Sequence, residues 1–174
     1  MNLLDIILIS LGLACDAFVV SITIGLNYKK IPLKVPLMTS FTFSLFQVIM
    51  PMLGFLVAYN FNPSITILTK FISFGILSII GINMLLSKED TTVDLKNILV
   101  LGLATSLDAF AIGLSLAFLE VNLLIALTSI GLITFLMCFV GPYLGNYFGT
   151  KILGKPYIVG GIILIVIGLK ILIF

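Results

Sequence analysis

Six long apolar stretches, separated by short polar connections, make up most of the chain. A helix needs roughly 20 predominantly apolar residues to cross a bilayer, and each stretch is about that long. No connection is long enough to hold a soluble domain. The pattern therefore predicts an all-α, polytopic membrane protein with six transmembrane helices. Their expected bounds are about 3–26, 36–59, 67–86, 97–119, 122–146 and 156–174.

The composition points to lipid as the main solvent of the chain. Of its 174 residues, 61% are hydrophobic and 9% are charged, and the mean hydropathy is +1.34. A soluble domain typically carries about 25% charged residues. Histidine is absent, and every basic residue is lysine. This composition argues against histidine-based zinc or copper sites and against nucleic acid as a partner.

The distribution of lysine predicts the orientation in the membrane. Cytoplasmic connections are enriched in basic residues, and here the lysines gather at the first, third and fifth connections. Those connections hold Lys29, Lys30, Lys34, Lys88, Lys96, Lys151 and Lys155, whereas the second and fourth have only Lys70 at a helix edge. We expect a plasma-membrane (inner-membrane) protein with both termini outside the cytoplasm. Lys170, about one turn from the end of the last stretch, is expected to snorkel outward.

The first apolar stretch is expected to stay in the protein as a transmembrane helix. It is not preceded by a basic segment, and no small-residue cleavage site follows closely after it. A secretory signal peptide would have both the basic segment and the cleavage site.

The two halves of the chain resemble each other. Aligning the first and fourth stretches at an offset of 92 superimposes Asp16 on Asp108, each followed by Ala-Phe. Small residues recur every four positions in both: Ala17, Ser21 and Gly25 in the first, Ala109, Gly113 and Ala117 in the second. Such a stripe allows close helix approach. The second and fifth stretches also share a Pro-x-Leu-Gly segment, at Pro51 and Pro142.

This similarity predicts two inverted three-helix repeats within one membrane domain. Residues 1–86 form the first repeat, 87–96 a cytoplasmic connecting loop, and 97–174 the second repeat. A repeat with an odd number of spans places its second copy upside down. Inverted repeats are common in secondary transporters, whose substrate site lies near the midplane at the repeat interface.

Asp16 and Asp108 are the main candidates for a functional site. Each lies near the centre of its stretch, where an ionised aspartate costs roughly 2.5–3.5 kcal/mol on insertion scales. We expect no lysine or arginine at the same depth. One interpretation is that each acid is protonated and hydrogen-bonds a neighbouring helix. The favoured one, because the two acids are equivalent in the repeats, is that they face each other and bind a cation.

Further oxygen donors are expected at the same depth. Carboxylates combined with amide, hydroxyl and backbone oxygens suit Mg²⁺, Ca²⁺ or Mn²⁺. Gln47 precedes Pro51 by four residues, as Cys138 precedes Pro142. Proline removes the helical hydrogen bond to the carbonyl four residues earlier, so these two carbonyls could face the site. The alternative is that both prolines only kink their helices for packing.

The midplane hydroxyls are weaker candidates. Ser21, Thr105 and Ser106 lie close to the acids in sequence. Serine and threonine in membrane helices commonly bond to their own backbone, and this alternative is expected to hold more often, for Thr23 and Ser115 as well.

Other polar residues are given structural roles. Asn83 is expected to make an interhelical hydrogen bond, and Asn122 to cap the fifth helix. Cys15 and Cys138 are expected to pack as small hydrophobic residues. The charged residues of the central loop are expected to be solvated; they are Lys88, Glu89, Asp90, Asp94 and Lys96.

The segments around the two aspartates resemble the paired signatures of the bacterial manganese efflux pumps of the MntP type. They read Gly12-Leu-Ala-Cys-Asp-Ala-Phe-Val-Val-Ser21 and Ala104-Thr-Ser-Leu-Asp-Ala-Phe-Ala-Ile-Gly113. The first departs from the family at Cys15, where methionine is common. The resemblance covers the whole chain and implies export of Mn²⁺ driven by the membrane potential or protons, with Asp16 and Asp108 essential.

The expected function is therefore secondary export of Mn²⁺ from the cytoplasm, with no enzymatic activity and no cofactor. The expected partners are Mn²⁺ as substrate, protons as coupling ion, the lipid bilayer and, where the protein dimerises, a second copy of the chain. Alternatives are export of another divalent metal or small solute within the lysine-exporter-like superfamily. An intramembrane aspartyl protease or a thiol-electron carrier is less favoured: a Gly-x-Gly-Asp motif is absent, and the two cysteines are not equivalent in the repeats.

Overall fold

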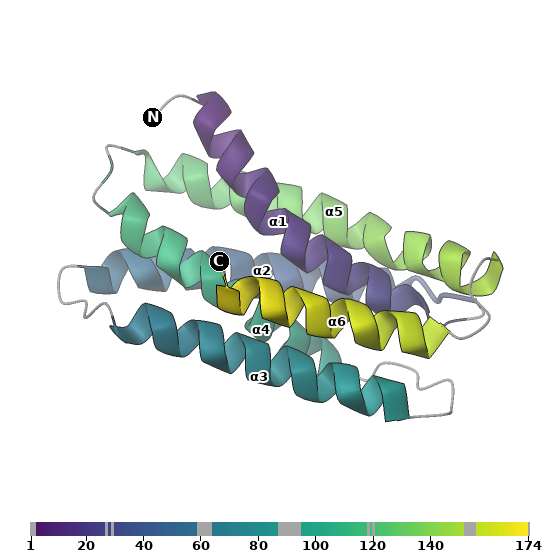
Figure 1. Ribbon diagram of the computed structural model, residues 1–174. Coiled ribbons are helices and arrows are strands. Elements are labelled where there is room, and N and C mark those ends of the chain that lie inside the picture. Colours follow the sequence, from purple (N-terminus) through teal and green to yellow (C-terminus); the bar gives the residue numbers. More distant parts are fainter. Residues whose placement is uncertain are drawn as a thin grey trace.

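The fold was analysed in a computed structural model of the chain. It describes residues 3–26, 28, 30–58, 64–86, 95–117, 119, 121–151 and 156–173. These residues form six helices that run back and forth along one bundle (Figure 1). In chain order the helices are α1 (Leu3–Leu26), α2 (Lys34–Val57), α3 (Ser64–Leu86), α4 (Leu95–Leu116), α5 (Leu123–Lys151) and α6 (Pro156–Ile173).

The helices are apolar enough for a multi-pass membrane protein. Among the described residues, α1, α2, α4 and α5 each contain a stretch that is long and apolar enough to cross a bilayer. The described parts of α3 and α6 hold shorter apolar segments, Phe74–Asn83 and Ile158–Lys170. Large apolar side chains such as Leu4, Leu124 and Leu132 are exposed on the outside of the bundle, where lipid replaces water.

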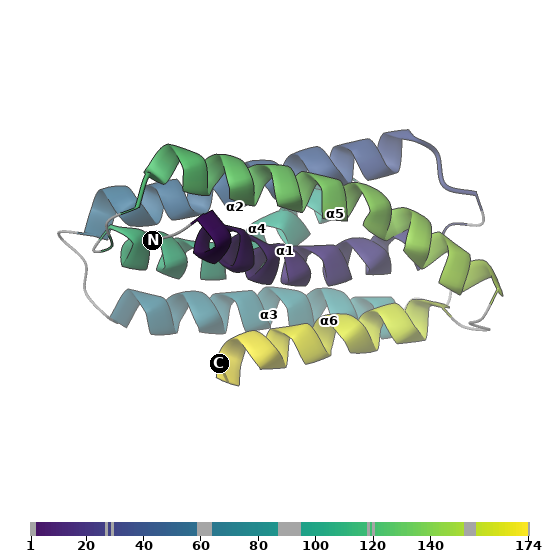
Figure 2. The ribbon, with the colours of Figure 1, turned by 90° about the horizontal axis from the view of Figure 1, so that it is seen from above.

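Three pairs of helices provide most of the packing. The largest contacts join α1 to α5, α2 to α4 and α3 to α6, and α2 also packs along α5. Figure 2 shows α3 and α6 as one layer beneath the others. Smaller contacts join α3 to α4 and α1 to α6. Each of these pairings has a counterpart when the first three helices are exchanged, in order, with the last three.

Glycines allow the paired helices to approach until their backbones touch. A Cβ built on Gly113 of α4 would overlap the Pro51 carbonyl of α2, and one built on Gly25 of α1 would overlap the Pro142 carbonyl of α5. Both prolines therefore lie at helix crossings, as the packing interpretation of these prolines requires.

Several helix ends differ from the predicted bounds. We expected the fifth helix to end near 146, but α5 continues to Lys151. Gly149 does not end the helix; it packs against the backbone of Leu26, where a Cβ would not fit. The fourth helix ends at Leu116 instead of about 119, and it begins at Leu95, so Lys96 is helical. The remaining loop, 87–94, lies outside the described residues.

The two ends of the bundle differ in character. At one end lie the α1–α2, α3–α4 and α5–α6 connections (Figure 1). We call this the lysine end, because Lys30, Lys34 and Lys96 are exposed there. The other end carries the α2–α3 and α4–α5 connections and the start of α1. Helix α6 starts near the lysine end, and its last described turn lies short of the other end of the bundle (Figure 1).

Candidate cation site

Asp16 and Asp108 lie in the middle of two antiparallel helices, α1 and α4. Helical side chains lean toward the N-terminus of their own helix. Because α1 and α4 run in opposite directions, the two aspartates lean in opposite directions along the bundle axis. Asp108 lies within electrostatic range of both Asp16 and Lys170. The arrangement brings the two predicted site residues into one region of the interior.

Gln47 of α2 bridges these two helices. Its Nε2 donates hydrogen bonds to the carbonyl oxygens of Leu13 in α1, at 3.3 Å, and of Thr105 in α4, at 3.4 Å. Leu13 and Thr105 are each three residues before an aspartate, so the bridge lies one turn from both acids. The side chain of Gln47 is fully buried. Its Oε1 has no hydrogen-bond partner among the described residues, which leaves a buried acceptor beside the acids.

Lys170 of α6 forms an ion pair with Asp16, with its Nζ 2.5 Å from Oδ1 of the carboxylate. Two expectations are therefore wrong: Lys170 does not snorkel outward, and a lysine does lie at the depth of the acids. The reason is geometric. Helix α6 packs against α1, and Lys170 lies in the last turn of α6. A helical side chain leans back toward the start of its helix, so the Lys170 side chain reaches from the outer side of the bundle to Asp16.

The midplane hydroxyls bond to their own helices. Ser21 donates to the Phe18 carbonyl (2.6 Å), Thr105 to Leu101 (2.9 Å) and Ser106 to Leu103 (3.0 Å). Thr23 and Ser115 do the same. The expected backbone bonding is confirmed. Each hydroxyl oxygen keeps acceptor capacity, so a supporting role beside an ion is compatible with these bonds.

The described residues hold no group of three or more His, Cys, Asp or Glu side chains that could bind a metal. Two carboxylates alone do not satisfy a hard divalent cation, which takes six or more oxygen ligands. An ion between Asp16 and Asp108 would therefore need amide, hydroxyl, backbone or water oxygens. The Oε1 of Gln47 is one candidate, because it is buried and has no hydrogen-bond partner among the described residues.

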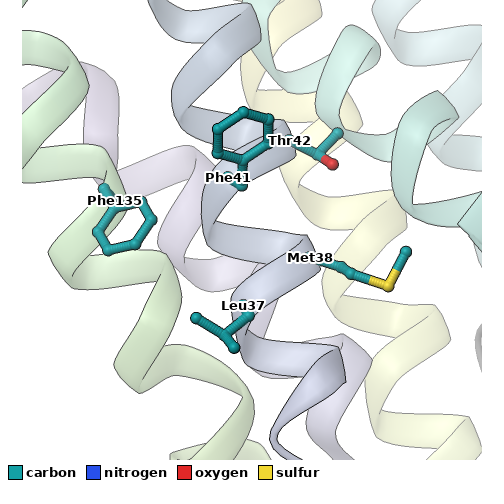
Figure 3. A pocket seen from close by; sticks show the side chains of 5 residues that line it. All are labelled: Leu37, Met38, Phe41, Thr42 and Phe135. Carbon is teal, nitrogen blue, oxygen red and sulfur yellow. The ribbon is translucent and has the colours of Figure 1, made fainter.

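A hollow between α2 and α5 is separate from the acids. It has a volume of about 520 Å³ and is lined by Leu37, Met38, Phe41, Thr42 and Phe135. Figure 3 shows Phe135 of α5 on the side of Leu37 and Phe41, whereas Met38 and Thr42 extend to the other side of α2. Four of the five lining residues are apolar, so the hollow suits a hydrocarbon group and lacks ligands for a cation.

Comparison with known proteins gives the family. Residues 30–172 match the sequence family described as "Putative manganese efflux pump". A relative from Acetivibrio thermocellus, named "Putative manganese efflux pump MntP", is 44% identical over 99% of this chain and 91% of its own length. Relatives of the same name from Desulfitobacterium hafniense and Methanothermobacter thermautotrophicus are 40% and 37% identical, also over 99% of this chain. No solved structure matches the chain.

The chain belongs to the MntP family of manganese efflux pumps. The resemblance found in the two aspartate signatures is confirmed over the full length of the chain. MntP proteins are named as efflux pumps, so membership agrees with a transporter and with Mn²⁺ as the transported substrate, and does not suggest an enzyme.

The remaining predictions for this MntP member have mixed outcomes. Asn122 caps α5 as expected: its Oδ1 accepts hydrogen bonds from the backbone N–H groups of Leu124 and Ile125. Cys138 is buried beside the Ser21 hydroxyl, whereas Cys15 is exposed. The expected interior packing is thus wrong for Cys15, which lies on the outer side of α1. The role of Asn83 stays a prediction.

Sequence reasoning missed the partners of two residues at the MntP candidate site. The depth of Gln47 was predicted, but its bridge between repeat-equivalent carbonyls was not. Lys170 was assigned to the membrane surface. Lys170 is in the last turn of α6, so its contact with Asp16 depends on how α6 packs against α1, which a count of residues does not give.

Proposed function

We propose that this protein exports Mn²⁺ from the cytoplasm as a secondary transporter, holding the ion near the bilayer midplane between Asp16 and Asp108. The Gln47 bridge is the observation that supports this most directly. It ties α1 to α4 one turn from both acids, and the amide oxygen of the same side chain is buried without a hydrogen-bond partner among the described residues. Carboxylate and amide oxygens are ligands that suit Mn²⁺.

The transport cycle rests on two inverted repeats, α1–α3 and α4–α6. The exchange of helix pairings described above supports this arrangement: α1 packs on α5 as α4 packs on α2, and α3 packs on α6 across the repeats. Repeats related in this way expose a central site to either side by rocking against each other. The close crossings at Gly25 and Gly113 are the contacts on which such rocking would turn.

The lysine end faces the cytoplasm. Lys30, Lys34 and Lys96 are exposed there, and basic residues near helix ends favour the cytoplasmic side. Mn²⁺ enters from this end and leaves at the other. The proton motive force drives export, with protons from outside replacing the ion at the acids, since two carboxylates close together in a low-dielectric interior disfavour being charged at the same time.

Replacing either acid tests the site. Asp16→Asn and Asp108→Asn remove one charge with little change in volume, and we expect Mn²⁺ transport into inside-out vesicles to fall by at least about tenfold to a hundredfold. Even the loss of a residue that only supports a metal ligand typically has an effect of that size. Asp5→Asn, in the first turn of the same helix α1, is the matched control and is expected to transport normally. Parental rates in both midplane variants would exclude the site.

The main competing function is export of another divalent metal or a small solute. Growth of cells with and without the gene, across Mn²⁺, Fe²⁺, Cd²⁺ and Ca²⁺, separates these alternatives. Sensitivity to Mn²⁺ alone is expected. Equal tolerance of all four metals would favour a solute that is not a metal.

A further inference from the structure

The ion pair between Lys170 and Asp16 joins the last described turn of α6 to the middle of α1. The Nζ lies 2.5 Å from the Asp16 carboxylate. The aspartate side chain is 14% exposed, whereas the lysine side chain is 55% exposed. The Lys170 side chain therefore reaches from the outer side of the bundle to a largely enclosed carboxylate. Because this side chain is long and flexible, its ammonium group can also move away from Asp16.

The two acids are unequal in this respect. Asp108 accepts a hydrogen bond from the backbone N–H of Ala109 at 2.9 Å. Helix α3 packs on α4 in the position that α6 takes on α1, but its described polar side chains are Ser78 and Asn83, which carry no charge. Within the described part of the chain, one acid is matched by a cation supplied by its neighbouring helix, and the other is not.

Charge balance then separates the empty site from the loaded site. Two ionised carboxylates balance the double positive charge of a divalent cation. With Lys170 also at the site, the same group would carry an excess positive charge in a low-dielectric interior, which is strongly unfavourable. The ammonium and the ion also compete for the same oxygen, Oδ1 of Asp16. Ion binding and the lysine pair therefore exclude each other.

We propose that Lys170 is a tethered counter-cation: its ammonium occupies Asp16 in the empty transporter and is displaced when Mn²⁺ binds. The inference rests on the proposed function, because it assumes that Mn²⁺ binds at Asp16. In the empty transporter the lysine neutralises one carboxylate, so that α1 can change position without carrying a bare charge through the low-dielectric interior. In the loaded transporter the ammonium swings away from the acid on its flexible stem.

This role predicts opposite effects on binding and on turnover. In Lys170→Gln the ion no longer competes with an ammonium, so we expect purified protein to bind Mn²⁺ about fivefold more tightly, the factor that corresponds to a partly exposed ion pair. Binding is followed by loss of the six-line electron paramagnetic resonance signal of free Mn²⁺. In vesicles the same variant is expected to show a lower half-saturating concentration and a lower maximal rate.

Two further variants exclude simpler explanations. Lys34→Gln removes the same charge from the exposed start of α2 and is expected to leave Mn²⁺ affinity unchanged. Lys170→Arg keeps the charge and can hold a carboxylate with two hydrogen bonds, so we expect Mn²⁺ affinity to fall about threefold. Lys170→Arg also decides the question if Lys170→Gln does not fold.

The outcomes distinguish this inference from the proposed function. If Asp16→Asn loses Mn²⁺ binding but Lys170→Gln binds with parental or weaker affinity, the lysine is not a displaced counter-cation, although the site stands. Equal tightening in Lys34→Gln would also overturn the inference, because the effect would then be one of overall charge. If the parental protein itself fails to bind Mn²⁺, the proposed function fails first.

Discussion

Gln47 uses the two ends of its amide group differently. The Nε2 is shared between two backbone carbonyls on two helices, while the Oε1 is buried without a described partner. An unsatisfied buried acceptor typically costs about 1–3 kcal/mol, which is a high cost for packing alone. The asymmetry is explained if the oxygen has a ligand during transport.

Gln47→Leu separates packing from ligation. Hydrogen bonds between membrane helices are worth about 0.6 kcal/mol on average, so we expect little loss of thermal stability. Mn²⁺ transport is expected to fall about tenfold or more, because an ion ligand is lost. Ser44→Ala is the matched control and is expected to transport normally. Ser44 also donates an interhelical hydrogen bond from α2, but to the Gly131 carbonyl of α5, at 2.8 Å. If the two variants transport equally well, Gln47 is a packing residue.

For single residues, the sequence predicted the depth in the bundle better than the contacts with other residues. The depth of Asp16 and Asp108 follows from counting residues along an apolar stretch, and the backbone bonds of Ser21 and Thr105 follow from local chemistry. The Asp16–Lys170 pair joins positions 154 residues apart. Such a contact depends on which helices are neighbours and where α6 stops, and neither can be obtained from local hydropathy.

Several helices approach each other where a glycine of one meets a backbone carbonyl of another. Glycine has no Cβ, so the neighbouring backbone can come close there. Gly113 against Pro51 and Gly25 against Pro142 are two such crossings, one in each of the largest pairings between the halves.

Adding a methyl group at these crossings is expected to separate the helices. Gly113→Ala or Gly25→Ala should each destabilise the detergent-solubilised protein by about 1–3 kcal/mol, the usual cost of overpacking, and slow Mn²⁺ transport. Thermal unfolding gives the stability. Gly12→Ala and Gly75→Ala are matched controls, because nothing lies within 4 Å of a Cβ built at either position; there the better helix propensity of alanine should leave stability unchanged or slightly higher. If all four variants melt at the parental temperature, the helices at the two crossings can separate without loss of stability.

The existence and order of the six helices could be predicted from hydropathy, whereas several of their ends could not. Gly149 looked like a helix end because glycine commonly follows a helix. In the structure it lies inside α5, where it admits the backbone of Leu26. A glycine required for close approach and one that ends a helix look alike in a single sequence.

As far as the structure describes it, the molecule is a bundle with unlike ends, in which Asp16, Asp108 and Gln47 lie inside and Lys170 reaches Asp16 from the outer side. The exposed lysines at the lysine end predict its side of the membrane. That prediction concerns the whole chain, because one misplaced helix would reverse every connection after it.

Labelling of single cysteines tests the orientation. In a Cys15→Ala/Cys138→Ala background, Lys34→Cys is expected to react with a membrane-impermeant maleimide only after cells are permeabilised. Leu124→Cys, at the other end and 73% exposed, is expected to react in intact cells. The reverse pattern would place the lysine end outside. Normal Mn²⁺ transport by the cysteine-free background would also exclude a thiol-electron carrier.

The long separation between Asp16 and Lys170 also has a consequence for biosynthesis. The ribosome delivers α1 to the membrane well before it translates α6, so the nascent chain must hold an aspartate in lipid without its lysine until translation has passed position 170. Nascent chains stalled after α5 should therefore be the form most readily recognised by membrane quality-control proteases.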